Sequence, residues 1–487
     1  MKYRAASLGV LGFTVGLAGC MVGPKYKVPT APAPPAYKEA TSPDAFKETA
    51  DWHIAKPADA IPRGAWWTIF NDAELNTLEP QVEAANQQLK AADANLRAAR
   101  ATIRVRNADK YPTVGVEPLV GGERDSANQP YFNSINANNG VANLLLPVEA
   151  SWELDLWGRI RRNINAAKEE AQASAGDRAN MLLSLQAELA TDYFEVRAAD
   201  AQKKLLADTV GQYKEALRVT RNRFEGGISP KSDVTQAETQ LRAAEVSAED
   251  IEVGRSQYEH AIAILLGKAP SEVTLPFVPL PVETTPPVVP AGLPSAMLER
   301  RPDIAAAERR TAEANEQIGI ARAAFFPTIG LTGAVGLEST DIGNLFSPSS
   351  LVYSVGPGLA YTLFDAGRRR GVSDQAIAGY EAQAANYKQS VLTAYQQVED
   401  NLAALRILQG EAQSQQGATA SALESERIFN NRYVGGVDTY LQVITAQTAA
   451  LNNQRNDIEI LRRRMDATVL LIKVLGGGWD RSQLPPQ

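Results

Sequence analysis

The residue types that most often carry catalysis or hold metals are scarce in this chain of 487 residues. Its two histidines, His53 and His260, lie far apart, and neither has a second ligand at metal-binding spacing. Asp and Glu are numerous, but they are spread along predicted helices rather than paired for acid–base work. The glycine-rich stretches lack the preceding strand and the Lys-Ser or Lys-Thr pair of a phosphate-binding loop. We therefore expect a protein that is not an enzyme and needs no metal or diffusible cofactor.

The only cysteine, Cys20, closes a secretory signal. Lys2 and Arg4 precede an apolar run that ends at Ala18, and a small-residue cleavage site follows. Residues 17–20 read LAGC, which resembles a bacterial lipobox, where cleavage precedes a cysteine that becomes lipidated. We expect residues 1–19 to be a lipoprotein signal peptide and Cys20 to carry a covalent lipid anchor. The alternative is an ordinary signal peptide followed by an unmodified cysteine.

The charge and cysteine content exclude several classes of partner and site. Removal of residues 1–19 leaves 47 cationic and 56 acidic residues, a net charge of −9, which argues against nucleic acid as a partner. One cysteine allows no disulfide within the chain and no cysteine metal cluster. No apolar run of eighteen residues follows the signal, so we expect no transmembrane helix. Met21 stands where an inner-membrane retention signal would place Asp.

Two helical hairpins organise the rest of the chain. Residues 223–228 read RFEGGI and residues 432–437 read RYVGGV, each between two long polar, Ala-rich segments. The pairs Gly226-Gly227 and Gly435-Gly436 predict a helix end and a tight reversal, because Gly adopts left-handed conformations without steric cost. The copies lie 209 residues apart, and Gly158 and Gly367 have the same offset. We expect a duplicated structural half whose offset is unbroken by gaps.

The spacing of apolar residues and prolines predicts the following order of segments. We expect a lipidated Pro-rich strap and equatorial part at 20–72, a helix at 73–110, two strands at 111–157, a long helix and a return helix at 158–269, a Pro-rich linker at 270–295, a helix at 296–325, two strands at 326–365, a second long helix and return helix at 366–475, and a tail at 476–487. Each long helix, about 66 residues or roughly 100 Å, is about twice as long as the others. Pairs of short helices stacked end to end would match it, forming a tall cylinder.

Four alternating stretches predict a sheet with one apolar face. The predicted apolar residues are Val114 and Val116, then Leu144, Leu146, Val148, Ala150 and Trp152, then Ile329, Leu331, Val335 and Leu337, and finally Tyr353, Val355, Pro357, Leu359, Tyr361 and Leu363. Strands of about ten residues with this pattern are typical of a transmembrane barrel. Aromatic residues near the strand ends fit an interfacial girdle. Four strands are too few to close, so other copies must complete the barrel, and a trimer of twelve strands would leave a lumen.

A water-soluble coiled-coil rod is the alternative for the helices alone, which are poor in large apolar residues. Short motifs in a fixed order favour a specific family. They are CMVGP at 20–24, the aromatic residues Trp66, Trp67 and Phe70, DLWGR at 155–159, LERRPDI at 298–304, FFP at 325–327, LFDAG at 363–367 and LGGGW at 475–479. Together they resemble the TolC/OprM-type outer-membrane efflux lipoproteins, of the NodT-like branch that serves tripartite RND pumps.

That resemblance implies an α+β membrane protein. In the family a homotrimer shares one twelve-stranded β-barrel, four strands per chain, above a long α-helical periplasmic barrel with a mixed α/β equatorial region. It implies a passive outer-membrane exit duct for drugs or other small toxic compounds. A periplasmic adaptor protein and an inner-membrane RND transporter would be its partners, with outer-membrane lipid around it. The channel of a type I protein secretion system and an envelope lipoprotein without a pore are the alternatives.

The resemblance also implies functional positions at the hairpin ends. Gly226, Gly227, Gly435 and Gly436 would mark the tips that dock the adaptor. The residues implied as a periplasmic gate are Asp233, Tyr433, Asp438 and Leu441. An Asp matching Asp233 bonds a Tyr matching Tyr433 between hairpins in the family, and a Leu matching Leu441 can form an apolar constriction. Gln442 and Thr445 stand where relatives carry aspartates, so this chain departs from a carboxylate ring. The alternative is that Asp233 is an ordinary first-turn residue and Tyr433 ordinary packing.

Three arginine clusters permit two interpretations. Arg159, Arg161 and Arg162 open the first long helix, and residues 368–370 open the second. They are either solvated cations at a helix start, where the dipole mildly disfavours them, or contacts to lipid phosphates or acidic equatorial residues. Residues 462–464 are predicted to form a solvated helix face.

Overall fold

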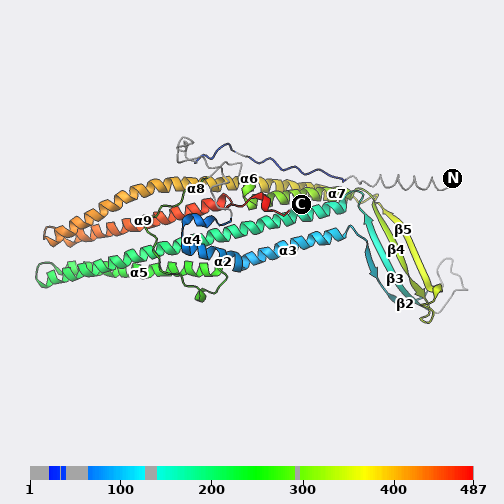
Figure 1. The fold of residues 1–487 in the computed structure, drawn as a ribbon, viewed down its shortest axis with the longest axis horizontal. Helices are drawn as coiled ribbons and strands as arrows, with labels where there is room; N and C mark the ends of the chain where they lie inside the picture. The colour runs from blue at the N-terminus through cyan, green and yellow to red at the C-terminus, as the bar shows by residue number, and fades with distance from the viewer. Residues whose placement is uncertain are drawn as a thin grey trace.

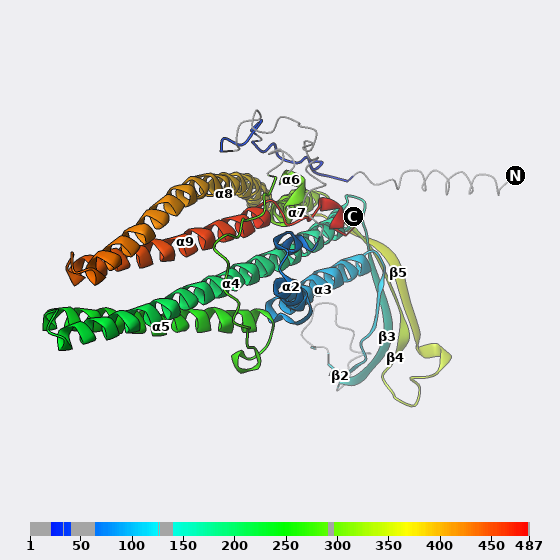
Figure 2. The same ribbon diagram turned by 60° about the vertical axis from the view of Figure 1, so that its left-hand side comes forward.

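The computed structural model describes residues 21–32, 34–39, 64–124, 126, 140–290 and 297–485. The predicted signal peptide, Cys20 and His53 lie outside the described residues. The molecule is elongated, with long helices running side by side and a sheet at one end (Figure 1). The tips of the two hairpins lie at the opposite end, as Figure 2 also shows. Among the described helices, none combines the length and the apolar character that a membrane crossing requires.

The helix predicted at 73–110 is two helices, α2 (Ala73–Ala85) and α3 (Gln87–Ala108). Asn86 breaks the run with an extended ψ of 130°, and its side chain accepts hydrogen bonds from the N–H groups of Gln88 and Leu89. Asn is among the best residues for capping a helix start, so the amphipathic period continues while the backbone does not. The single-helix prediction is wrong at this point. The predicted apolar stripe is nevertheless buried at Leu75 and Leu89.

The long helices α4 (Arg159–Glu225) and α8 (Arg368–Val434) each have 67 residues. Their return helices, α5 (Lys231–Leu265) and α9 (Tyr440–Val474), each have 35. All four bounds of the first hairpin recur 209 residues later in the second. The sequence places the end of the second long helix near Asn431, three residues before its observed end at Val434.

The offset between the two repeats is larger for the helices that precede the strands. Helix α6 (Met297–Arg300) precedes α7 (Pro302–Ala323), and α7 and α3 both have 22 residues but lie 215 residues apart. The prediction of an unbroken offset of 209 is therefore wrong for the segments before the strands. The loop at 340–350 is six residues shorter than its counterpart at 124–140, which accounts for the difference. The short 3-10 helices lie at Trp66–Phe70, Pro270–Glu272, Pro348–Ser350 and Arg481–Gln483.

Within the described residues the sheet has five antiparallel strands. They are β1 (Thr113–Val116), β2 (Leu119–Glu123), β3 (Val141–Leu154), β4 (Thr328–Ser339) and β5 (Leu351–Ala360). Both β1 and β2 pair with β3, so the first predicted strand is interrupted at Glu117-Pro118, where Pro118 cannot donate a ladder hydrogen bond. Strand β5 ends at Ala360, so Tyr361 and Leu363 lie beyond the strand that the alternation predicts.

The register places the predicted apolar residues on one face of the sheet. Val148 is opposite Val116 on one side and Val335 on the other, and Val335 is opposite Tyr353. Because side chains alternate along a strand, the neighbouring row that contains Glu149 and Ala334 occupies the other face. The predicted division of the strands into two faces is confirmed for the paired residues of β1 to β5.

The helices continue the order of the strands below the sheet. Helix α4 packs against α3 and α7, and α7 packs against α8, so the row runs α3, α4, α7, α8 (Figure 2). The principal core lies where α2, α4, α5 and α9 meet and includes the fully buried Trp66, Leu189, Ile262 and Ile472. Phe70 packs on Phe194 with ring centroids 5.0 Å apart, so the aromatic motif residues Trp66, Trp67 and Phe70 all contact this core.

Residues 21–32 and 34–39 belong to an extended strap along the outside of α7 and α8 (Figure 1). The Val22 N–H donates to the Trp157 carbonyl at 3.1 Å, next to the sheet. Further along, the Tyr26 hydroxyl donates to the Glu308 carboxylate at 2.6 Å. The Glu399 carboxylate accepts from the N–H groups of Lys38 and Glu39. Specific polar contacts therefore attach the strap to the helices at both of its ends.

Candidate functional site

The ends of the two hairpins are built by the same turn. In the first, the Gly227 N–H donates to the Phe224 carbonyl at 2.9 Å and the Ile228 N–H to the Arg223 carbonyl at 2.8 Å. This pair of bonds is the Schellman pattern, which requires a left-handed residue after the helix. Gly227 has φ of +68° and Gly436 has +76°, whereas Gly226 and Gly435 have negative φ. Only the second glycine of each pair is needed for its backbone freedom.

A small apolar cluster joins the two hairpins just behind these turns. It contains the buried residues Ala237, Tyr433, Tyr440 and Val443. The Tyr433 and Tyr440 rings have centroids 5.1 Å apart at 53°. Burial and the neighbouring Tyr433 raise the pKa of the Tyr440 hydroxyl to about 12, so it is neutral at physiological pH. The hairpin ends thus share an uncharged, apolar cluster.

Arg223 crosses from the first hairpin to the second. Its guanidinium lies 4.7 Å from the centroid of the Tyr433 ring, and its Nη1 donates to the Val434 carbonyl at 3.1 Å. A cation over an aromatic face is attracted by the ring quadrupole, and Val434 is the last residue of α8, where helix carbonyls lack partners. Arg223, near the end of α4, therefore donates a hydrogen bond to the last backbone carbonyl of α8.

The predicted bond between Asp233 and Tyr433 is not formed within the chain. The Tyr433 hydroxyl is buried and has no hydrogen-bond partner in the described structure. Asp233 is half-buried in the first turn of α5, where its N–H donates to the Pro230 carbonyl. The physical reason is that the Tyr433 ring packs at 53° against Tyr440 and lies next to the Arg223 guanidinium, so its ring rather than its hydroxyl contacts the other hairpin.

The other predicted gate residues lie near the turn of the second hairpin. Asp438 accepts from Arg432 Nε at 2.5 Å, so it braces the turn of its own hairpin. Leu441 is 55% exposed, and Gln442 and Thr445 are exposed as well. The Thr445 hydroxyl donates to the Leu441 carbonyl at 2.9 Å, which is a bond within α9. These three side chains are free to face a second copy of the chain or a lumen.

Sequence reasoning did not identify Arg223, although a signal for it exists. Arg223 and Arg432 are equivalent in the two repeats, since they lie 209 residues apart. The residue equivalent to Asp438 is Ser229, which offers Arg223 no carboxylate. Without a carboxylate at position 229, Arg223 reaches the other hairpin. Comparing the repeats position by position would have indicated the difference.

A second polar contact joins the hairpins farther along, between α4 and α9. Arg462 forms ion pairs with Glu195 of α4 and, within α9, with Asp466 at 2.7 Å. Burial raises the pKa of the Asp466 carboxyl to about 7, despite the nearby Arg462. Burial and the adjacent Glu188 and Glu195 likewise raise the pKa of the Asp192 carboxyl to about 7. The prediction of a solvated face at 462–464 is therefore wrong for Arg462.

The arginines that open α4 are paired rather than solvated. Arg159 pairs with Glu153, and Arg161 with Asp155. Arg162 is buried, with its Nη1 2.9 Å from Glu316 of α7 and its Nε donating to the Val22 carbonyl of the strap. In α8, Arg369 pairs with Asp365 at 2.6 Å. These four arginines pair with acidic residues, but the partners lie at the sheet, beside it or on α7, and not in the predicted equatorial part at 20–72.

Comparisons with known proteins agree with this architecture. The family model described as outer membrane efflux protein matches residues 78–268 and 293–477. The probable efflux pump outer membrane protein TtgC of Pseudomonas putida is 32% identical over 483 residues, covering 98% of this chain and 96% of that protein. The solved outer-membrane channel OprN is 28% identical with a TM-score of 0.84, covering 94% of this chain and 100% of that one. The open-state MtrE channel of Neisseria gonorrhoeae is 26% identical with a TM-score of 0.79, covering 95% and 99%.

The match extends over both repeats, over the sheet and over the hairpins that carry the candidate site. A family model that covers both halves of the duplication, together with a relative matched along nearly its whole length, identifies the family. The chain belongs to the outer membrane efflux protein family and is an outer-membrane efflux channel protein.

Proposed function

We propose that this protein is the exit duct of a tripartite efflux pump, in which three copies enclose one continuous channel. The observation that carries the proposal is the sheet, which has one apolar face and two strand edges, at β5 and at β1 and β2. An open edge cannot persist in lipid, where nothing else satisfies its backbone groups. Three chains, each counting β1 and β2 as one strand, would close a twelve-stranded barrel with a water-filled lumen.

In this proposal the helices continue the lumen through the periplasm. The row α3, α4, α7, α8 follows the strands, so three rows form a helical barrel beneath the β-barrel. The hairpin ends with Gly227 and Gly436 then form the far opening, where a periplasmic adaptor and an inner-membrane RND transporter would dock. Asp233, Tyr433, Asp438 and Leu441 line or brace that opening.

We propose drugs and other small toxic compounds as the exported substrates. Relatives are named as antibiotic and toluene efflux pump outer membrane proteins of Pseudomonas putida. Passive conduction requires no catalytic residue in the duct, so the pump would supply both energy and selection. A covalent lipid on Cys20 would add an anchor beside the sheet, since Met21 and Val22 contact the sheet–helix junction at Gly158 and Trp157.

Two measurements test the proposal. Native mass spectrometry of the detergent-solubilised protein should give a trimer, and planar-bilayer recordings should give discrete conductance steps. A stable folded monomer without conductance would contradict it and favour an envelope lipoprotein without a pore. Palmitate labelling of the wild type and of Cys20→Ser tests the anchor separately, because the sheet alone should keep the unlabelled variant in the membrane.

A further inference from the structure

We propose that the seam between copies is closed by two ion pairs, one joining Arg104 to Asp374 and one joining Arg97 to Glu381. Each pair links α3 of one copy with α8 of the next, and Arg104 crosses the helix surface at Gly371. The inference rests on the proposed trimer and identifies the residues by which its copies recognise one another.

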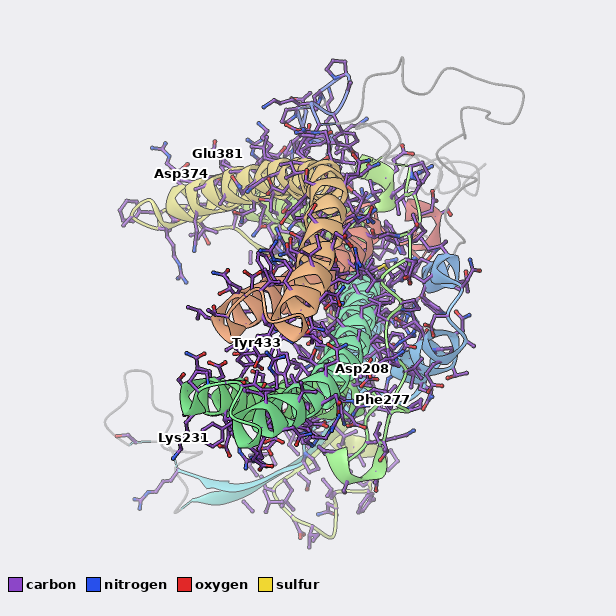
Figure 3. All side chains as sticks on the ribbon, turned by 90° about the vertical axis from the view of Figure 1, so that its left-hand side faces the viewer. Asp208, Lys231, Phe277, Asp374, Glu381 and Tyr433 are labelled. Carbon is purple, nitrogen blue, oxygen red and sulfur yellow. The ribbon has the colours of Figure 1, made fainter. Side chains whose placement is uncertain are left out.

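The first observation is a set of charged side chains that lack partners in one chain. Arg97 and Arg104 on α3 and Asp374 and Glu381 on α8 are exposed, and none forms an ion pair or side-chain hydrogen bond with the described residues. The labels of Asp374 and Glu381 lie along the outer side of α8 in Figure 3. One helix thus offers unpaired cations and the other unpaired anions.

The second observation is the position of these helices. In the row α3, α4, α7, α8, the two helices with unpaired charges are the outermost (Figure 2). They continue the two edges of the sheet, because α3 leads into β1 and β5 leads into α8. When copies are arranged in a ring, α8 of one copy is therefore the neighbour of α3 of the next. The partner that fits both charge stripes is a second copy of this chain.

The internal duplication supplies a template for that seam. Residues of α4 correspond to residues of α8 that lie 209 later, and residues of α3 to residues of α7 that lie 215 later. Packing of α4 on α7 within one chain is therefore the counterpart of packing of α8 on α3 between copies. The side-chain contacts between α4 and α7 can be transferred, residue by residue, to the seam between α8 and α3.

Within the chain, a buried arginine crosses a glycine to reach a carboxylate. A Cβ on Gly319 of α7 would collide with the side chain of Arg162 of α4. Arg162 continues to Glu316, three residues farther from the sheet, with Nη1 2.9 Å from the carboxylate. Small size at 319 is needed because the arginine occupies the space above that residue.

When these contacts are transferred to the seam between α3 and α8, the arginine and the glycine change places. Gly319 corresponds to Arg104 and Arg162 corresponds to Gly371, so the arginine now comes from the short helix and the glycine from the long one. Asp374 lies three residues beyond Gly371, farther from the sheet, as Glu316 does relative to Gly319. The position of Asp374 corresponds to Asn165, whose side chain lies next to the Glu316 carboxylate and so faces the first seam.

The second pair follows from the same correspondence. Arg97 corresponds to Ala312 and Glu381 to Gln172, and both counterparts are buried between α4 and α7. Gln172 accepts from Arg309, which lies one turn from Ala312, at 3.2 Å. On each helix the two charges are seven residues apart, about two turns, so they share a face. Because α3 runs towards the sheet and α8 away from it, Arg104 and Asp374 both lie nearer the sheet, and Arg97 and Glu381 both lie farther from it. A single alignment of the two helices therefore allows both ion pairs.

Cysteine cross-linking tests the register. Purified protein carrying Arg104→Cys and Asp374→Cys, treated with a short bismaleimide, should give covalent dimers and trimers on a denaturing gel. Arg97→Cys with Glu381→Cys should behave in the same way. The matched control, Arg104→Cys with Glu381→Cys, places the thiols roughly 10 Å farther apart along the helices and should give at least tenfold less product. Each single variant controls for reaction at Cys20.

Charge exchange tests the pairing independently. Asp374→Arg should lower the fraction of trimer that survives heating in detergent, and the exchange of Arg104→Asp with Asp374→Arg should restore it. Asp208→Arg, at an exposed site on α4, is the control and should have no effect. The wild type could be trimeric while the cysteine pair at 104 and 374 cross-links no better than the mismatched pair at 104 and 381. That result would overturn the proposed ion pairs between α3 and α8 but not the proposed duct. A wild type that is not trimeric would overturn the proposed duct as well.

Discussion

Equivalent residues of the two repeats do different work, which is clearest for Arg223 and Arg432. Both follow the same helix surface to the same kind of turn. Arg432 pairs with Asp438 in its own hairpin, whereas Arg223 meets Ser229 at the equivalent place and crosses to Tyr433 and Val434. The arginine of the second repeat, which has Asp438, thus stabilises its own turn, whereas the arginine of the first repeat, which has Ser229, contacts the other hairpin. The tip depends on a ring and a backbone carbonyl rather than on an acid–tyrosine bond.

At this scale we expect Tyr433→Phe to preserve the tip. The Tyr433 hydroxyl has no partner in the described structure, so its removal deletes no hydrogen bond and relieves a buried polar atom. Thermal unfolding and single-channel conductance should match the wild type. Tyr433→Ala removes a buried ring and should destabilise the protein by about 3–5 kcal/mol. A clear effect of Tyr433→Phe on conductance would show that the hydroxyl bonds another copy.

At the scale of elements, short capping and breaking signals divide long periodic segments. Asn86 separates α2 from α3, and Pro118 separates β1 from β2, without any change in the apolar pattern. The hairpins instead end at a left-handed glycine, which closes the same turn in both repeats. Element lengths are therefore set by single residues, while the faces of the elements are set by the apolar period.

The two glycines of a hairpin turn should differ in their response to substitution. Gly227 has φ of +68°, so Gly227→Ala should cost about 1–2 kcal/mol, the penalty of a left-handed conformation for an L-residue. Gly226 has φ of −79°, and a Cβ added there would lie 3.4 Å from its nearest neighbouring atom, so Gly226→Ala should be close to neutral. The thermal unfolding midpoints of the two variants provide the comparison. Equal losses would mean that the turn is not restricted by φ.

The two faces of the sheet should also differ. Leu331 belongs to the apolar row and Thr332 to the opposite one. If the apolar row faces lipid, Leu331→Lys near the midplane should cost about 2–4 kcal/mol, whereas Thr332→Lys should cost little. Trimer yield in outer-membrane extracts measures the difference, and equal yields would contradict a lipid-facing row.

For the whole molecule, the two repeats are joined by the pairing of β3 with β4, by the packing of α4 on α7 and by contacts between the hairpins. Near the tip the hairpin contact is apolar and includes Tyr433 and Tyr440. Between α4 and α9 the principal apolar core is accompanied by a polar cluster, in which Arg462 faces Glu195, Glu459 and Asp466. Asp192 of α4 adds a further carboxyl to the surroundings of Asp466. Four carboxyl groups (Glu195, Glu459, Asp466 and Asp192) thus surround the single Arg462 guanidinium. The stability of this contact between α4 and α9 should therefore depend on pH.

The sign of that response follows from the raised pKa values. Asp192 and Asp466 have pKa values of about 7, above the roughly 3.9 of an exposed Asp, so the folded state holds protons that the unfolded chain has released. Their stabilising contribution is complete below about pH 4 and is lost as the pH rises to about 7. We expect Asp192→Asn to reduce the fall in unfolding midpoint between pH 5 and pH 8. Asp208→Asn, at an exposed site, should leave that fall unchanged, and identical slopes for all three proteins would contradict the prediction.

Local patterns in the sequence were sufficient for the order of the main elements and for the faces of the strands, but not for the breaks at Asn86 and Pro118. The long helices, the glycine turns and the apolar rows depend on the identity of neighbouring residues, so they could be recognised without any contact information. The same is true of the family, because motifs such as DLWGR and LERRPDI are contiguous. The sequence alone also indicated the duplication, through the recurrence of the hairpin motif after 209 residues.

Tertiary structure decided which side chains meet. No spacing along the chain places Arg162 over Gly319, Arg462 beside Glu195, or Arg223 on Tyr433, because each contact joins segments more than a hundred residues apart. The free energy of a charged side chain depends on its surroundings, so the same Arg-rich pattern is paired throughout in α4, with Arg162 buried, but exposed in part in α8. Packing of one repeat on the other determines those surroundings, and that packing is a property of the folded chain.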